Sequence, residues 1–201
     1  GLISGEVIDL DCWDRFWWNR MKETPGAILG STRKRLSENE TRSVISTLIN
    51  NSVRALLIIG GNDSAETALA ISDAAMSAGI DLCVIHIPKT IDNDLVGTVH
   101  SPGYGSAARF VALATMGVGR DAETMGEESP ITVLEVMGRD AGWLASASAL
   151  AKIEEVDAPH VVCVPEILFW EDQFLSNMES SYRRFGFAVA VVSENVRGPS
   201  G

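Results

Sequence analysis

The chain has 201 residues, and 46% of them are hydrophobic, which is enough to build a folded domain with a substantial core. Its net charge of -11 excludes a non-specific surface for nucleic acid or for an anionic membrane, because a polyanion does not attract phosphate groups. Any phosphate that this protein binds must therefore meet a local cluster of positive groups.

Cysteine usage favours a reducing, cytoplasmic setting. Cys12, Cys83 and Cys163 are too few and too scattered for a disulfide framework. No segment approaches the length of a membrane span, and the first residues lack the basic and apolar regions of a signal peptide. These first residues have the character of the middle of a longer chain.

From about Ser37 onward, helical patterns alternate with short apolar runs. Ser37 and Glu40 have the spacing of a capping box, so a helix is expected to begin there. The continuous apolar run from Ala55 to Ile59 predicts a strand that is covered on both faces. The segment before Ser37 is less clear, and its "RFWWNR" fits either a helix end or a packed loop.

The rest of the chain continues this alternation. Further strands are expected at residues 82–87, 131–136, 160–164 and 188–192. Further helices are expected at residues 64–78, 106–123, 143–152 and 171–185. Repeated β-α units imply a parallel sheet with right-handed crossovers. We therefore predict a single α/β domain over residues 1–201, with helices on both faces of an open, mostly parallel sheet, in a Rossmann-like three-layer arrangement.

Ligands of open parallel sheets gather beyond the carboxyl ends of the strands. The segments that follow the five predicted strands are, in order, "GGNDS", "PKTIDND", "MGRDAG", "PE" and "SEN". The charged clusters of interest are therefore expected at one edge of the sheet.

The first of these segments suits a phosphate group. Gly60 and Gly61 let the backbone approach a ligand closely, and the helix that follows offers its first amide groups to an anion. An ordinary strand-to-helix turn, capped by Asn62, Asp63 or Ser64, explains the same segment equally well. The chain contains no P-loop motif.

The second segment, "PKTIDND", combines two carboxylates with a lysine. An aspartate close to a substrate hydroxyl can act as a general base, and Lys89 can neutralise charge on a transferring phosphoryl group. The alternative is an Asx-rich turn with solvated carboxylates. Arg139, at the end of the third strand, and Arg33, beside Lys34 and Arg35, suit bidentate contacts with phosphate, although a solvated surface explains both arginines as well.

In this order, "LGSTR", "IGGNDS", "PKTIDND", "EVMGR", "VPE" and "SEN" resemble the phosphofructokinase family, over about residues 26–195. The resemblance implies a phosphofructokinase-like fold and makes Asp92 the base that takes a proton from the sugar 1-hydroxyl. The residues that it implies around fructose 6-phosphate are Thr90, Asp94, Met137, Gly138, Arg139 and Glu194. The residues expected at the phosphoryl donor are Arg33, Gly60, Gly61 and Ser64.

Two positions bear on the identity of the donor. The family members that use pyrophosphate carry an aspartate and a lysine where those that use ATP carry glycines, and these positions are Asp63 and Lys89. An aspartate occupies the space and the charge that an α-phosphate would need, and a lysine attracts a compact, highly charged donor. The resemblance therefore implies a glycolytic phosphotransferase that uses pyrophosphate, with Asp63, Lys89 and Asp92 in catalytic positions and Mg²⁺ as cofactor.

Several features depart from the family pattern and keep alternatives open. Asn62 stands where the family has an aspartate that helps to bind magnesium, so the metal would depend on Asp94 or on the pyrophosphate itself. Pro130 stands where the family often has a subunit-bridging arginine, and the family's first and last motifs are absent. We expect the central part of a longer chain that forms a homo-oligomer when complete. The alternatives are an ATP-dependent 6-phosphofructokinase and a catalytically silent regulatory subunit.

Overall fold

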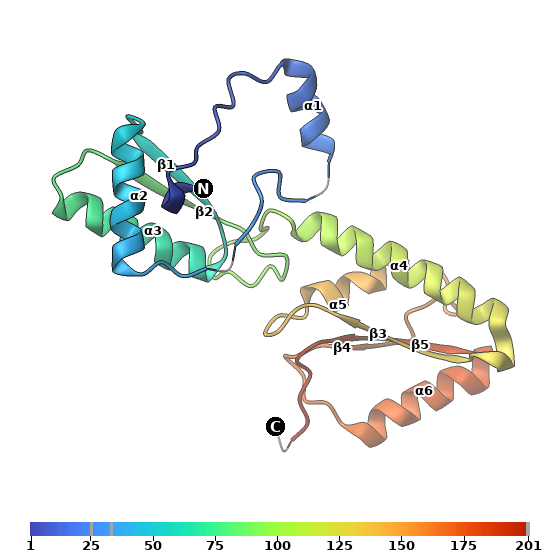
Figure 1. Cartoon of the computed structure of the whole chain (residues 1–201). Coiled ribbons are helices and arrows are strands. Elements are labelled where there is room, and N and C mark those ends of the chain that lie inside the picture. Colours follow the sequence, from blue (N-terminus) through green and yellow to red (C-terminus); the bar gives the residue numbers. More distant parts are fainter. Residues whose placement is uncertain (25, 33, 200–201) are drawn as a thin grey trace. The chain divides into compact units, whose positions relative to one another are not determined.

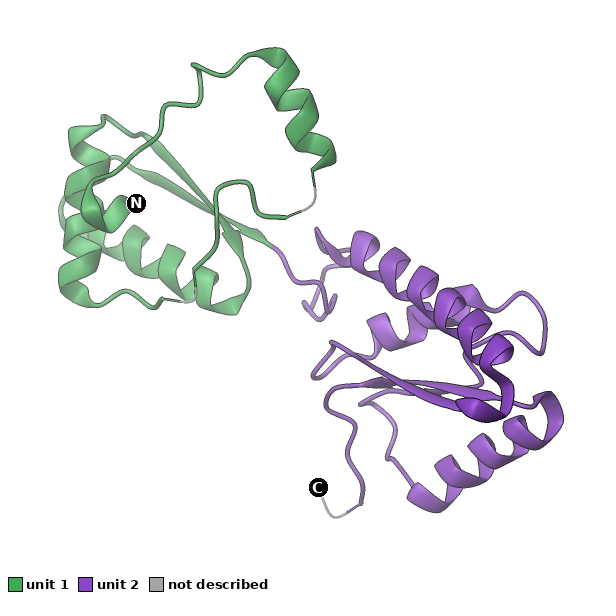
Figure 2. Ribbon diagram, turned by 45° about the vertical axis from the view of Figure 1, so that its right-hand side comes forward, with its two compact units in different colours: residues 1–88 green, residues 89–201 purple. Residues whose placement is uncertain are grey.

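The structure is a computed structural model that describes residues 1–24, 26–32 and 34–199. It divides the chain into two compact units, Gly1–Pro88 and Lys89–Gly201 (Figures 1 and 2). The described strands form a two-stranded sheet and a three-stranded sheet, and all their pairings are parallel. Apolar runs identify strands but carry no information about which strands pair, because pairing depends on contacts between distant segments. No helix in the described ranges is long and apolar enough to cross a membrane.

The described residues of the first unit form a two-stranded sheet and three α-helices. Its elements are η1 (Leu2–Ser4), α1 (Arg15–Glu23), α2 (Glu38–Asn50), β1 (Ala55–Gly60), α3 (Asn62–Ser77) and β2 (Cys83–Pro88). Strands β1 and β2 pair in parallel, from Ala55 opposite Cys83 to Gly60 opposite Pro88. The two strands therefore end at the same edge, where the "GGNDS" segment begins.

Helices α2 and α3 cover one face of this sheet. Their apolar side chains form a core with Leu56 and Ile58 of β1. Leu57 and Ile59 alternate with them and are 56% and 61% exposed. The helices of this unit therefore cover one face of β1, and not both faces as expected. A continuous apolar run hides the period-two alternation of a strand, so the sequence could not show which side chains are left uncovered.

The aromatic segment before Ser37 forms a helix. Asp14 caps α1, because its carboxylate accepts a hydrogen bond from the Trp17 amide at 2.7 Å. Helix α1 contains no buried residue, and the Trp13 and Trp17 rings pack on each other with centroids 4.2 Å apart. Of the two options that the sequence left open, the helix is correct.

The second unit is a three-layer α/β arrangement. Its elements are α4 (Tyr104–Met125), η2 (Gly126–Glu128), β3 (Ile131–Val136), α5 (Trp143–Ala147), η3 (Ser148–Ala151), β4 (Val161–Cys163), α6 (Glu171–Phe185) and β5 (Ala188–Ser193). The strand order is β3-β5-β4, and both pairings are parallel. Helices α4 and α5 lie on one face of the sheet and α6 lies on the other (Figure 2). The central strand β5 is almost completely buried. This layering confirms the predicted fold class.

Some boundaries differ from the predicted ones. The helix expected over residues 143–152 is an α-helix only to Ala147 and continues as a 3-10 helix, in which the Ser148 hydroxyl donates to the Ala145 carbonyl three residues earlier. A serine that bonds the preceding turn competes with the α-helical pattern. Strand β4 begins at Val161, one residue later than expected.

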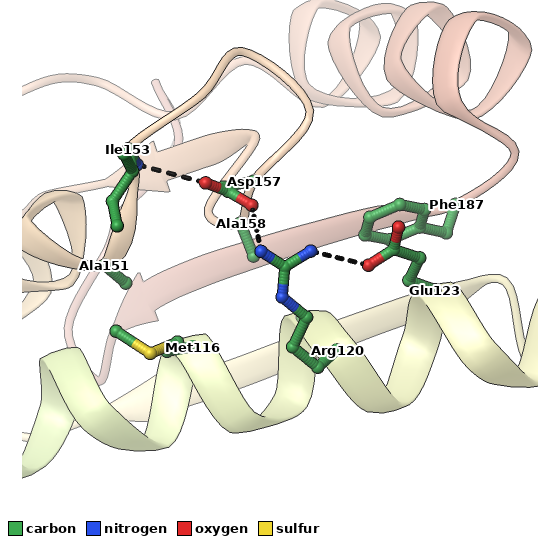
Figure 3. Close-up of a pocket in the computed structure, with 9 residues that line it drawn as sticks. Met116, Arg120, Glu123, Ala151, Ile153, Asp157, Ala158 and Phe187 are labelled. Atoms are coloured by element: carbon green, nitrogen blue, oxygen red, sulfur yellow. Dashed lines mark hydrogen bonds and ion pairs between the residues drawn. The ribbon is translucent and has the colours of Figure 1, made fainter.

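An ionic network closes a small pocket between α4 and the loop before β4. Arg120 pairs with Glu123 at 2.7 Å and with Asp157 at 2.9 Å, and Asp157 also accepts from the Ile153 amide (Figure 3). The pocket has a volume of about 40 Å³. None of the predicted site residues in the described ranges lines it, so we assign this network to the packing of the loop.

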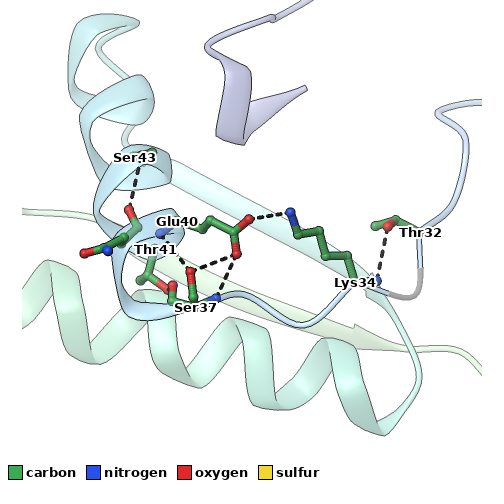
Figure 4. Close-up of polar contacts among 7 residues, drawn as sticks. Thr32, Lys34, Ser37, Glu40, Thr41 and Ser43 are labelled. Atoms are coloured by element: carbon green, nitrogen blue, oxygen red, sulfur yellow. Dashed lines mark hydrogen bonds and ion pairs between the residues drawn. The ribbon is translucent and has the colours of Figure 1, made fainter.

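The capping box at the start of α2 forms as predicted. The Ser37 hydroxyl accepts from the Glu40 amide, and the Glu40 carboxylate accepts from the Ser37 amide at 3.0 Å (Figure 4). The Lys34 ammonium bonds the same carboxylate and, together with the Ser37 amide, lowers the pKa of Glu40 to about 2. The sequence determined this helix start locally.

Candidate active site

The "TIDND" loop follows β2 and opens the second unit. The Asp92 amide donates to the Thr90 hydroxyl at 3.2 Å. Asn93 is buried and has a φ of 56°, in the left-handed region that asparagine tolerates better than most residues. Its side chain accepts from the Ser101 amide at 2.8 Å and donates to the Val99 carbonyl at 3.2 Å. The loop is therefore an ordered turn that presents Asp92 and Asp94 on either side of a buried asparagine.

The apolar side chain of the loop is packed into the core of the second unit. Ile91 lies against the cluster that contains Ala108 and Leu144. Gly103 approaches it closely, because a Cβ at this position would lie 3.3 Å from Ile91 Cγ2. Gly103 also has a φ of 93° at the start of α4. The segment "GYGSAA", residues 103–108, thus brings α4 close to the loop. Sequence reasoning missed this role of Gly103, and it missed the two hydrogen bonds by which Asn93 holds the loop.

Asp92 lies among four charged side chains of the same unit. Its Oδ1 is buried and has no hydrogen-bond partner among the described residues. Burial raises the pKa of Asp92, and the charges of Asp94 and Glu194 raise it further. The positive charges of Arg139 and Lys89 act in the opposite direction but do not cancel the increase. The loops after β2, β3 and β5 therefore converge on Asp92, as the sequence predicted for this edge.

The "MGR" loop is tied to the end of β5. The Gly138 amide donates to Glu194 Oε1 at 3.3 Å, and the buried Ser193 hydroxyl donates to the Gly138 carbonyl. Gly138 has a φ of 125°, and a Cβ there would lie 2.6 Å from the Ala141 carbonyl oxygen. Only glycine fits this position, and the tight turn leaves the side chains of Met137 and Arg139 exposed. Glu194 is thus held by the loop that it was expected to accompany.

The "GGNDS" loop lies in the first unit, between β1 and α3. A Cβ on Gly60 would lie 2.1 Å from Ser64 Oγ, so this position also requires glycine. Gly61 is the N-cap of α3, and no side chain caps this helix. The alternative of a turn capped by Asn62, Asp63 or Ser64 is therefore wrong. The geometry leaves the first amides of α3 without a side-chain acceptor in the described part of the chain.

The basic side chains of Lys34 and Arg35 form ion pairs with acidic side chains. Lys34 pairs with Glu40, and Arg35 pairs with Asp63 at 2.8 Å. Both side chains of the Arg35–Asp63 pair are more than half exposed. Arg33, which the resemblance places at the donor, lies outside the described residues. The expected meeting of Asp63 with Asp92, Arg139 and Glu194 around one cleft stays a prediction, because Asp63 belongs to the other unit.

The residues present fit a magnesium ion only together with a substrate. The described residues contain no group of three or more His, Cys, Asp or Glu side chains that could hold a metal by themselves. Asp92 and the exposed Asp94 repel each other, and one oxygen of Asp92 has no partner among the described residues. Mg²⁺ commonly uses one or two carboxylates together with substrate phosphates. This pair is therefore compatible with a metal that arrives with a phosphate donor.

Comparison with known proteins identifies the family of this chain. The family model described as phosphofructokinase matches residues 1–201. The chain is 39% identical to the pyrophosphate–fructose 6-phosphate 1-phosphotransferase of Rhodospirillum rubrum and 41% identical to that of Halomonas elongata, in each case over 100% of this chain and 49% of the relative. The crystal structure of a pyrophosphate-dependent phosphofructokinase from Nitrosospira multiformis matches with a TM-score of 0.89 and 36% identity, over 100% of this chain and 51% of that one.

The matching family model and the convergent loops define the class of protein. This chain belongs to the phosphofructokinase family. It spans about half the length of the curated relatives that it matches.

Proposed function

We propose that the protein containing these residues transfers a phosphoryl group from pyrophosphate to the 1-hydroxyl of fructose 6-phosphate, a step of glycolysis. The observation that carries the proposal is Asp92, which has a raised pKa and lies near Lys89 and Arg139. Its buried Oδ1 has no hydrogen-bond partner among the described residues. A carboxylate with a raised pKa suits a general base near neutral pH. The relatives named above are pyrophosphate-dependent phosphotransferases that act on fructose 6-phosphate, which supports the same donor and acceptor.

Each group then has a defined task. Asp92 removes the proton of the sugar hydroxyl as the hydroxyl oxygen attacks the phosphoryl group. Lys89 offsets the negative charge on the transferring phosphoryl group, and Arg139 offsets the charge on the phosphate of the sugar. The other residues assigned to the sugar phosphate are Thr90, Asp94, Met137, Gly138 and Glu194. Those assigned to pyrophosphate are Arg33, Gly60, Gly61 and Ser64.

The proposal includes Mg²⁺ as cofactor. Asp94 and the bound pyrophosphate would hold the ion, with Asn62 as a neutral oxygen ligand in place of an aspartate. When bound, the ion would neutralise charge on the donor phosphates. The proposal also places the complete protein in the cytoplasm as a homo-oligomer. The three free cysteines are compatible with a reducing compartment.

The choice of donor depends on Asp63 and Lys89. The Asp63 carboxylate would repel the α-phosphate of ATP. Arg35, bound to Asp63, offsets part of this repulsion but leaves the bulk of the side chain in place. Lys89 favours a compact, highly charged donor. We therefore expect pyrophosphate to support turnover and ATP not to do so.

The test is a donor-swap assay of the full-length protein with fructose 6-phosphate. The Asp63→Gly/Lys89→Gly double variant should use pyrophosphate less well than the parent protein. The Arg35→Gln variant, which keeps Asp63, serves as control and should keep the preference for pyrophosphate. Equal turnover of the parent protein with both donors would favour the ATP-dependent alternative. Absence of turnover with either donor would favour a silent regulatory subunit.

A further inference from the structure

The loop that carries Arg139 is held at both ends by carboxylates. At its first end, the Gly138 amide donates to Glu194 after β5. At its second end, the Gly142 amide donates to Glu166 Oε1 at 2.8 Å. Glu166 lies in the turn after β4, and β4 flanks the central strand β5 on the side opposite β3. Residues that follow β5 and β4 therefore hold the loop that follows β3.

The contact with Glu166 depends on a close approach that only glycine allows. A Cβ on Gly142 would lie 2.5 Å from Val164 Cβ and 2.7 Å from Glu166 Oε2. The turn that presents Glu166 is closed by a hydrogen bond from the Ile167 amide to the Val164 carbonyl at 3.2 Å. The backbone of the loop thus lies directly against the turn after β4, and the carboxylate bonds the amide that faces it.

Beyond Gly142 the chain enters the core. The Gly142 carbonyl accepts from the Ser146 amide at 2.8 Å, and Leu144 and Ala145 of α5 are buried. Arg139 is exposed and lies between the two bonded glycines, so a carboxylate contact restrains its backbone on each side. Glu166 is also exposed, and its bond to Gly142 is its only hydrogen bond in the described part of the chain.

We propose that Glu166 is a positioning residue that holds Arg139 in place for the phosphate of the sugar substrate. The proposal rests on the proposed function, because it assigns Arg139 to the sugar phosphate. A hydrogen bond from an amide to a charged carboxylate is stronger than one between neutral groups. Without it, the loop loses the only carboxylate contact at its second end that the described residues provide, and Arg139 is less well ordered before a substrate binds. Binding of the sugar phosphate should weaken, and the donor should be unaffected.

Steady-state kinetics of the full-length protein test this role. Glu166→Ala should raise the KM for fructose 6-phosphate by about tenfold, the value expected for one charged hydrogen bond. The KM for pyrophosphate and kcat should change by less than about twofold on the same scale. Glu166→Gln keeps an oxygen that can accept from Gly142 and should restore most of the binding. Glu128→Ala removes an exposed glutamate that has no ion pair among the described residues, and it should have no effect.

A measurement that does not require turnover separates this proposal from the proposed function. Amide hydrogen exchange of the Gly138–Gly142 segment should be faster in Glu166→Ala than in the parent protein, and it should be unchanged in Arg139→Ala. If the parent protein lacked turnover but this exchange pattern held, the proposed function would fail and the contact of Glu166 with the loop would stand. Unchanged exchange in Glu166→Ala would overturn the role of that contact. An equal rise in both KM values, or no rescue by Glu166→Gln, would overturn the positioning role.

Discussion

At the scale of single residues, Asp92 is half-buried between two residues that anchor its loop. Ile91, its neighbour, packs into the apolar cluster of the second unit, and Asn93 on its other side is pinned to the loop of residues 99–101. The carboxylate between them cannot withdraw into solvent without disturbing both contacts. The fold therefore holds Asp92 Oδ1 where no described residue offers it a hydrogen bond.

Replacement of Asp92 by asparagine should remove the base without removing the site. In the full-length protein we expect turnover to fall by about 10²–10⁴-fold, the usual contribution of a positioned base, while sugar phosphate still binds. Because the pKa of Asp92 is raised in the fold, its ionisation lowers stability as the pH rises above the ordinary carboxyl range. Asp92→Asn should therefore be at least as stable as the parent protein at neutral pH. Thermal unfolding and a binding titration provide the checks, and near-normal turnover would refute the assignment.

The pH dependence of the reaction should respond to Asp94. The charge of Asp94 raises the pKa of Asp92, and a base acts only when it is ionised. Asp94→Asn removes this repulsion, so the acid limb of kcat/KM should move to lower pH. Asp94→Glu keeps the charge and should leave the limb near its original position. A limb that moves to higher pH in Asp94→Asn would contradict the proposed interaction.

At the scale of elements, helix starts and strand ends depend on different kinds of information. The start of α2 depends on Ser37, Glu40 and Lys34, which lie within six residues of one another. The start of α3 has no side-chain cap, and its turn depends on Gly60 and the Ser64 side chain. The capping box stabilises the start of α2. At the start of α3, by contrast, the backbone amides have no side-chain acceptor among the described residues, and they lie at the loop that we assign to the donor.

Loss of the capping box should destabilise the first unit. Ser37→Ala removes the hydroxyl that accepts from Glu40, and we expect a loss of about 1 kcal/mol in the free energy of unfolding. Ser43→Ala, in the middle of the same helix, removes an exposed hydroxyl that only bonds the preceding turn and should have little effect. Urea unfolding followed by circular dichroism compares the two variants. Equal stability of both variants would show that the box contributes nothing.

The box also predicts a pH effect. The pKa of Glu40 is lowered to about 2 in the fold, so its contribution to stability is present above the ordinary carboxyl pKa. This contribution should be lost as the pH falls from the ordinary value of 4.5 toward 2. The Ser37→Ala variant should show a smaller loss over the same range, because one of the groups that lower the pKa of Glu40 is gone.

At the scale of the whole molecule, each unit has its own core. Residues of α2, α3 and the β1–β2 sheet form the core of the first unit. Three clusters form the core of the second unit: two include residues of β5, and the third joins α4, α5 and β3. A change that disturbs packing in one unit is therefore expected to act mainly within that unit.

Two glycines of α4 allow a matched test of this expectation. A Cβ on Gly119 would lie 2.7 Å from the Cβ of buried Ala158, whereas a Cβ on Gly117 would meet nothing within 4 Å. Gly119→Ala should destabilise the second unit by about 1–3 kcal/mol through overpacking. Gly117→Ala should stabilise the helix by up to about 1 kcal/mol. Hydrogen exchange should show the loss in Gly119→Ala within residues 89–201 and little change in α2 and α3. A loss spread equally over both units would contradict separate cores.

Much of this architecture could be predicted from the sequence because the signals are local. The apolar runs predicted all five strands to within one or two residues, and the spacing of Ser37 and Glu40 predicted the start of α2. The order of the loops predicted that Lys89, Asp92, Arg139 and Glu194 would gather at one edge, and the structure brings these four together in the second unit. Parallel strands share the edge at which they end, so their loops can be assigned from chain order alone.

Other features arise only when distant segments meet. Nothing in a continuous apolar run shows that β1 pairs with β2 while β5 pairs with β3 and β4, or that Leu57 and Ile59 lie on a face that the helices of their unit leave uncovered. The bond between the Gly142 amide and Glu166 joins residues 24 positions apart, and no spacing rule predicts it. By itself the sequence determined the local elements and the chemistry at their ends, because these depend on neighbouring residues. The tertiary structure decided which strands pair and which carboxylates hold the Arg139 loop, because these contacts form between segments that are distant in the chain.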